Sequence, residues 1–404
     1  MTEAPNVPTL DTNMHREIPD RTARTPHRNV FLILAFVIYS ATFAYAVWQG
    51  VTDPVRNWDM LAYVGSVISL DTSDPQAIHD RMLIDVKPVV PPELYREFSE
   101  KNPLSADPVS FYRILPLYRL KPLYIGAIWL AHRLGAGIAQ ATWLVSACSF
   151  AVLGIALAWW RPRGASRGVW LLAVVALCLL GQWPMAMLAA WSTPDALSLA
   201  LFMLAFVAWN RHRSAGGFAV CALLSILARP DALLLVLALT GWFAFAVSAE
   251  RRLRPCAAIF IAAAVSAAYL SIGIVGWNVL FYHTFVDIYF DFTKSVVKVT
   301  GTQYRRALVW GLLHEMQNAR MKVFIALSMI ALWCHRQCPS NQREWLWLLL
   351  MTWAVFVIRF LIFPAWGDER YYYPVYLLLL MSCLELIAPW IKASQEERDK
   401  PRPL

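Results

Sequence analysis

Residues 138–160 read IAQATWLVSACSFAVLGIALAWW and contain no Asp, Glu, Lys or Arg. An α-helix needs about 20 mainly apolar residues to cross the hydrocarbon core of a bilayer, so this stretch predicts a transmembrane helix. A second uncharged stretch, NVFLILAFVIYSATFAYAVWQ at 29–49, lies near the N-terminus and predicts another. The chain is therefore expected to cross a membrane more than once.

The composition of the whole chain indicates the same class of protein. Of its 404 residues, 58% are hydrophobic and 16% are charged, whereas a typical soluble domain has about 25% charged residues. One soluble core could not bury so much apolar surface. The formal net charge of +9 does not indicate nucleic-acid binding, because the basic residues stand in short clusters between apolar runs, as they do in cytoplasmic loops of membrane proteins.

The apolar runs predict an all-α polytopic membrane protein with about ten transmembrane helices. One run, 114–134, contains two prolines and three basic residues, which are unfavourable in a helix that faces lipid. We expect this run to form a re-entrant or interfacial helix on the outer face, and the remaining runs then place every basic cluster in the cytoplasm. The runs are 29–49, 114–134, 138–160, 169–190, 196–209, 215–228, 231–248, 256–277, 321–334, 345–363 and 371–391.

This topology predicts the organisation of the chain. Residues 29–391 form a single transmembrane domain, and the polar segments 1–28 and 392–404 are a disordered tail and a short tail, both cytoplasmic. Long segments at 50–137 and 278–320 lie on the outer face.

The first outer segment is acidic in its first part. Between residues 50 and 113 it has ten Asp or Glu against six Lys or Arg. The stretches 58–70 and 93–101 within it are typical of amphipathic helices that lie on a membrane surface.

Unusual polar groups occur where the predicted helices emerge on the outer face. The middles of the predicted spans are almost free of charge, whereas ion-coupled transporters usually place ionisable groups near the bilayer midplane. The number of predicted membrane crossings between them places five polar segments on the same side of the membrane. They are Asn57–Asp59, Tyr118–Tyr124, Trp191–Asp195, Ala228–Asp231 and Gly367–Pro374.

Most of these groups also have a purely structural explanation. Asp195 and Asp231 stand at predicted helix starts, where a carboxylate caps free N–H groups. Arg229 could be an interfacial anchor, and Tyr371 could belong to an aromatic belt. Asp59 is harder to explain in this way, because it lies in an apolar stretch, and we interpret it as functional.

The order of these residues resembles the GT-C superfamily of integral-membrane glycosyltransferases, which includes lipid A aminoarabinose transferases and protein O-mannosyltransferases. The family has an Asp in a long first outer loop, a Lys-Pro step, an acidic helix start, a basic turn and a late Arg-Tyr step. The resemblance covers about 29–391 and rests on this layout. The matching residues are Asp59, Lys121-Pro122, Asp195, Arg229-Pro230 and Arg370-Tyr371.

The resemblance implies sugar transfer from a polyprenyl-phosphate-linked donor to an acceptor on the periplasmic, outer face of a bacterial inner (plasma) membrane. Asp59 would be the general base, because the attacking group must lose a proton. Asp195 would be a second catalytic carboxylate, binding sugar hydroxyls or a divalent metal. Lys121, Arg119, Arg229 and Arg370 would bind the donor phosphate, and Trp58, Tyr63, Asp231, Glu369 and Tyr371 would form other substrate contacts.

Several alternatives stay open at this stage. No ligand spacing indicates a metal, so a divalent ion is only an option and no other cofactor is predicted. The acceptor could be a lipid, a glycan or a protein. A transporter or flippase of a polyprenyl-linked or amphipathic substrate would also need an apolar groove and phosphate-binding arginines, and a non-catalytic envelope-assembly subunit could share the fold.

Overall fold

The structure is a computed structural model that describes residues 26–160, 162, 165–180, 184–212, 214–246, 300–337, 342–362 and 369–398. Within these ranges the chain is helical and has no β-strand. The predicted span 256–277 and residues 1–25 of the predicted N-terminal tail lie outside the described residues.

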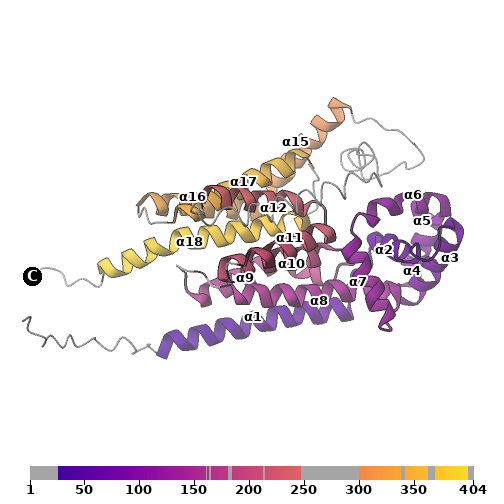
Figure 1. The fold of residues 1–404 in the computed structure, drawn as a ribbon, viewed down its shortest axis with the longest axis horizontal. Coiled ribbons are helices and arrows are strands. Elements are labelled where there is room, and N and C mark those ends of the chain that lie inside the picture. Colours follow the sequence, from indigo (N-terminus) through magenta and orange to yellow (C-terminus); the bar gives the residue numbers. More distant parts are fainter. Residues whose placement is uncertain are drawn as a thin grey trace, which may run out of the picture.

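An elongated helix bundle makes up most of the described chain (Figure 1). Helix α10 packs against α8 and α11, α18 packs against α16 and α17, and α1 packs against both α8 and α9. Helix α15, Gly301–Gln317, precedes α16 and falls within the predicted outer segment 278–320. The bundle helices are α1 Pro26–Thr52, α8 Ile138–Trp159, α9 Arg167–Leu179, α10 Asp195–His212, α11 Ala215–Ala228, α12 Ala232–Ala246, α16 Ala319–Gln337, α17 Arg343–Ile362 and α18 Tyr373–Arg398.

Four stretches of the described chain have the length and composition of a membrane-crossing helix. They are Asn29–Thr52, Ile138–Trp159, Arg343–Ile362 and Arg370–Ser394. Helices α9, α10 and α11 are apolar but shorter. The chain is therefore a helical protein with several apolar helices suited to a membrane.

A second group of helices, residues 58–133, lies at one end of the bundle, and we call it the head unit (Figure 1). Helix α1 begins and α18 ends at the opposite end of the bundle. The head unit has a hydrophobic core of its own, separate from that of the bundle. Its elements are α2 Trp58–Ile68, α3 Pro75–Val86, η1 Lys87–Val89, α4 Pro92–Arg96, η2 Glu97–Lys101, α5 Pro103–Ala106, α6 Pro108–Arg119 and α7 Pro122–Arg133.

The prediction that the stretch 58–70 is a surface amphipathic helix was wrong. All residues of α2 from Met60 to Ile68 are buried, because α3, α6, α7 and α8 surround the helix. A helix that is apolar all round belongs in a core, so α2 is the centre of the head unit. The stretch 93–101 is divided between α4 and the π-helical turn η2.

The segment 114–134, which was predicted to be one re-entrant helix, is divided between two helices. Helix α6 ends at Arg119 and α7 begins at Pro122. Proline disfavours a helical conformation in the residue before it, and Lys121 accordingly has a ψ of 60°. The break makes Lys121 a corner residue between two helices.

Two further boundaries differ from prediction. The run 169–190 is not one helix, because α9 ends at Leu179 and a 3₁₀ turn, η3, follows at Met185–Ala189. Helix α18 continues to Arg398, past the predicted limit at 391, since the polar residues there are good helix formers.

A close contact joins the end of α1 to η3. A Cβ atom on Gly50 would lie 2.4 Å from the carbonyl oxygen of Ala189, so the two backbones touch only because residue 50 is glycine. Just beyond, the Val55 N–H donates to the Ala190 carbonyl at 2.9 Å. These contacts fix the segment that leads into α2 against the segment that leads into α10.

We expect Gly50→Ala to lower the free energy of unfolding by about 1–3 kcal/mol, as overpacking does elsewhere. The measurement is denaturation of the purified protein in detergent micelles. Gly126→Ala is the matched control, because a Cβ there meets nothing within 4 Å; we expect it to be neutral or to stabilise by about 0.5–1 kcal/mol. If Gly50→Ala and Gly126→Ala were equally stable, the close contact between Gly50 and Ala189 would be contradicted.

Candidate functional site

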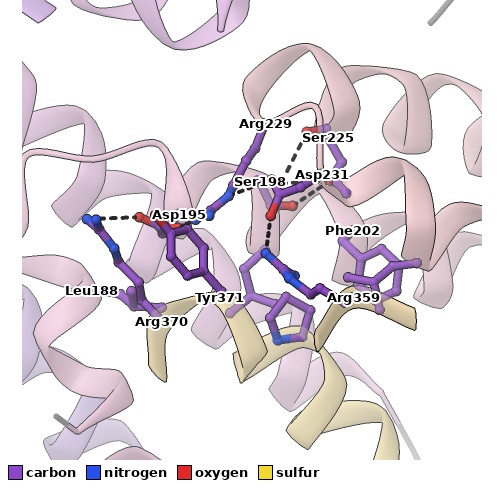
Figure 2. Close-up of a pocket in the computed structure, with 14 residues that line it drawn as sticks. Leu188, Asp195, Ser198, Phe202, Ser225, Arg229, Asp231, Arg359, Arg370 and Tyr371 are labelled. Atoms are coloured by element: carbon purple, nitrogen blue, oxygen red, sulfur yellow. Dashed lines mark hydrogen bonds and ion pairs between the residues drawn. The ribbon is translucent and has the colours of Figure 1, made fainter. Parts of the chain in front are cut away.

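Three carboxylates and three guanidinium groups from distant parts of the sequence meet at the head-unit end of the bundle. They alternate in the order Asp59, Arg370, Asp195, Arg229, Asp231 and Arg359, and we call this series the charge ladder. Figure 2 shows most of it around a cavity.

Asp59 lies in the first turn of α2. The side chain of Asn57 accepts a hydrogen bond from the Met60 N–H at 3.2 Å and starts the helix there. The Asp59 carboxylate accepts hydrogen bonds from the Tyr118 hydroxyl at 2.9 Å and from Arg370 Nη1 at 3.1 Å. Its side chain is 24% exposed. The helix start, a phenol and a guanidinium therefore hold this carboxylate in place.

Arg370 belongs to η4, the single turn Glu369–Tyr372 that precedes α18. The same Nη1 atom that contacts Asp59 lies 3.9 Å from Asp195 Oδ2. The guanidinium carbon is 5.3 Å from the centres of both the Trp191 and the Tyr371 rings. Arg370 thus links two carboxylates and contacts two aromatic rings.

Arg229 and Arg359 complete the ladder. Arg229 forms an ion pair with Asp195, and its Nε donates to Asp231 Oδ1 at 2.7 Å. Arg359 forms an ion pair with the other oxygen of Asp231. Asp195 is 4% exposed and Arg359 is 5% exposed, so these charges are almost entirely removed from water.

Tyr371 lies among all three arginines. Its ring centre is 4.3 Å from the guanidinium carbon of Arg229, 5.4 Å from that of Arg359 and 5.3 Å from that of Arg370. The electron-rich face of an aromatic ring attracts cations. The ring therefore helps to hold together three groups that repel one another.

Lys121 approaches Asp59 from the corner between α6 and α7. Its Nζ donates to the Tyr63 hydroxyl at 2.7 Å and lies 5.1 and 4.9 Å from the ring centres of Tyr63 and Tyr118. Burial lowers the pKa of Lys121, Asp59 raises it, and the nearby arginines lower it again, which gives a pKa of about 8. This amine therefore changes its charge close to neutral pH.

The Asp59 carboxylate stays ionised. Burial raises the pKa of Asp59, but Arg370, Lys121 and the Tyr118 hydrogen bond together bring it below its ordinary value.

The ladder and Lys121 together carry four cationic groups against three carboxylates. Among the described side chains of the site, one positive charge is in excess where water is largely excluded. Such a place attracts an anion, and arginine suits phosphate in particular, because it can donate two parallel hydrogen bonds.

A cavity opens on one side of the ladder (Figure 2). Its free space is about 20 Å³, which is room for roughly one water molecule. A larger ligand must therefore displace side chains. The lining combines Asp195, Arg229, Asp231, Arg359, Arg370 and Tyr371 with Leu188, Ser198, Leu199, Phe202, Ser225, Ala232, Leu235 and Pro374.

The structure brings most of the predicted site residues together. Trp58 and Tyr63 both lie against Tyr118, with ring centres 5.9 and 5.0 Å away. Arg119 is apart from the others, because its Nε donates to Ser69 Oγ at the far end of α2. Glu369 lies in η4, but its side chain is outside the described part of the structure.

The proposed metal-binding role of Asp195 receives no geometric support. Within the described ranges, no group of three or more His, Cys, Asp or Glu side chains could hold a metal ion. The carboxylates of the ladder face guanidinium groups instead.

Three residues of the site were not among the predicted ones: Arg359, Tyr118 and Trp191. Arg359 carried a usable signal, because it is the only charged residue between 345 and 362, and a charge inside an apolar helix usually has a function or a partner. Tyr118 and Trp191 lie in the quoted polar segments, but nothing in the sequence distinguishes them from other interfacial aromatics.

Comparison with protein-family models, with curated proteins and with solved structures finds no match for this chain. What the site can do chemically therefore rests on its own geometry.

Proposed function

We propose that the protein is a glycosyltransferase that moves a sugar from a polyprenyl-phosphate-linked donor to an envelope acceptor. The observation that carries the proposal is the excess of cations over carboxylates beside a partly apolar cavity, at the end of a bundle of apolar helices. A donor with a phosphate group and an isoprenoid tail has matching parts, since the phosphate needs cations and the tail needs apolar surface.

The arginines of the cavity suit the leaving group. In the reaction, the bond between the anomeric carbon and the phosphate oxygen breaks, and the phosphate keeps the electron pair. Arg229, Arg359 and Arg370 line the cavity and would stabilise the growing negative charge there. Preorganised cations in a place with little water are an effective means of stabilising a transition state.

Asp59 suits the role of general base. The acceptor oxygen or nitrogen forms a bond with the anomeric carbon and gives up a proton, which the Asp59 carboxylate takes. Direct attack from the side opposite the phosphate inverts the anomeric centre. General bases of this kind contribute about 10²- to 10⁴-fold to rate.

The proposed topology has about ten crossings, with both termini in the cytoplasm and the head unit on the periplasmic face of a bacterial inner membrane. The start of α1 and the end of α18 lie at the bundle end away from the head unit (Figure 1), as this topology requires. Cysteine substitutions labelled with a membrane-impermeant maleimide test it. Asp85 in the head unit and Lys392 in α18 are suitable positions, and only the first should react from outside.

The function is tested with purified protein in liposomes that contain a radiolabelled polyprenyl-phosphate sugar, to which an envelope extract of lipids, glycans and proteins is added as acceptor. We expect release of polyprenyl phosphate together with a labelled product. A flippase would instead move the label across the bilayer and leave the sugar–phosphate bond intact. That result, or an intact donor with no movement, would rule out the glycosyltransferase.

Phosphate binding should weaken as the pH rises above about 8. The pKa of Lys121 is about 8, so Lys121 is charged below that pH and neutral above it. We expect the affinity for citronellyl phosphate, a short polyprenyl phosphate, to fall by up to about tenfold per pH unit above this value. Binding is measured by calorimetry in detergent.

Lys121→Arg is the control for this pH dependence. Arginine keeps its charge throughout the range, so the variant should bind the ligand equally well at pH 7 and pH 9.5. The same loss in the variant as in the unchanged protein would show that another group titrates.

A further inference from the structure

Arg370 stands between Asp59 and the cavity. It lines the cavity together with Asp195, whereas Asp59 is not among the described residues of the lining. Asp59 instead contacts Tyr118 and Arg370 on the head-unit side. A donor phosphate in the cavity and an acceptor near Asp59 would therefore approach Arg370 from different sides.

Arg370 is held less closely than Arg229. Its Nη1 atom lies 3.1 Å from Asp59 and 3.9 Å from Asp195, whereas Arg229 forms an ion pair with Asp195 and donates to Asp231 at 2.7 Å. If Arg370 moves, Asp195 keeps its ion pair with Arg229, and Asp59, which is 24% exposed, keeps the hydrogen bond from Tyr118. A partly exposed charge costs less to leave without its partner than a buried one, so an incoming anion would displace Arg370 more easily than Arg229.

The size of the cavity also indicates that Arg370 moves when an anion binds. Its free space of about 20 Å³ cannot accept a phosphate group without movement of the lining. The longer of the two described Arg370 contacts with carboxylates, 3.9 Å to Asp195, joins two residues of the cavity lining (Figure 2). A phosphate oxygen placed there would compete directly for Nη1.

We propose that Arg370 is a positioning residue that couples donor binding to proton transfer: donor phosphate draws its guanidinium away from Asp59, and only then can Asp59 accept the proton of the acceptor. This inference rests on the proposed function. Before the donor binds, Arg370 helps to keep the pKa of Asp59 below its ordinary value, and such a carboxylate is a poor base. The arrangement makes the addition ordered, with the donor first.

Labelling with a hydrophobic carbodiimide tests the coupling without turnover, because this reagent modifies protonated carboxyl groups. The protein in micelles is labelled at pH 5.5 with and without citronellyl phosphate, and mass spectrometry measures the adduct on Asp59. We expect the phosphate to raise the labelling rate at Asp59 by about tenfold, because withdrawal of the Arg370 guanidinium raises the pKa of Asp59 and with it the protonated fraction. Labelling at Asp195 should stay constant, because Arg229 still holds it.

Two variants sharpen the test. Arg370→Gln should label Asp59 rapidly without ligand and show no further response. Arg113→Gln, a substitution of an exposed arginine on α6, should behave as the unchanged protein does. A purely structural role of Arg370 predicts no effect of citronellyl phosphate on Asp59 in any of these proteins.

The outcomes separate this inference from the proposed function. Sugar transfer with constant labelling at Asp59 would overturn the coupling and leave the glycosyltransferase standing. Ligand-dependent labelling without transfer from any polyprenyl-phosphate sugar would support the coupling to an anion and remove the glycosyltransferase.

Discussion

Asp59→Asn should reduce turnover by about 10²- to 10⁴-fold, the usual contribution of a general base. Asparagine has nearly the same shape and can still accept the hydrogen bond from Tyr118, which is 2.9 Å long in the unchanged protein. It cannot take a proton at neutral pH. Binding of citronellyl phosphate should be kept or become tighter, because Arg370 loses its ion pair with Asp59. The measurement is the initial rate of polyprenyl phosphate release at a saturating donor concentration.

Asp53→Asn is the matched control for this variant. Asp53 lies six residues earlier, is exposed and falls in the segment between α1 and α2. The same substitution there should leave turnover unchanged. Turnover of Asp59→Asn within threefold of the unchanged protein would exclude Asp59 as the base, whatever the donor affinity.

Arg229→Met should cause the largest loss of stability. The substitution keeps much of the side-chain length but leaves Asp195 and Asp231 without their shared partner. Breaking a buried ion pair by removing one member costs about 3–5 kcal/mol. The free energy of unfolding is measured by denaturant titration in micelles. Phosphate affinity should also fall, because the site loses its excess positive charge.

A second substitution should reverse part of this loss. The double variant Arg229→Met with Asp195→Asn lacks one of the two carboxylates that Arg229 pairs with in the unchanged protein. At least half of the lost stability should therefore return. Arg305→Met removes an exposed charge from α15 and should change stability by less than about 0.5 kcal/mol. Additive losses in the double variant would show that Asp195 and Arg229 do not interact.

The sequence allowed good prediction of helices that are recognised by a long uncharged run. The run 138–160 coincides with α8, Ile138–Trp159, to within one residue. For 58–70 the sequence predicted the limits of the helix closely, because α2 begins and ends near them, but it did not predict that the helix is buried. An apolar helix can be buried by lipid or by other helices, and only the packing of α3, α6 and α7 around α2 decides between them.

The site was predictable in outline and not in detail. The number of predicted crossings between Asp59 and Arg370 indicated that both lie at the same end of the helices, and they are in contact. The two basic residues Arg119 and Lys121 looked equivalent in the sequence. The helix break before Pro122 separates them, so that Arg119 contacts Ser69 and Lys121 contacts Tyr63. The direction of a side chain at such a break depends on backbone angles that no local pattern gives.

The positions of the ladder residues in the sequence decide the order in which they are synthesised. Asp59 and Arg370 are 311 positions apart, so at about 5–20 residues per second a ribosome needs roughly 15–60 s between them. The nascent chain must therefore carry its aspartates through insertion before α17 and η4 supply Arg359 and Arg370. Translation that stops before α17 yields a protein with uncompensated charge among apolar helices, a costly defect in a bilayer. The charge ladder is complete only after η4 and α18 have been released and docked.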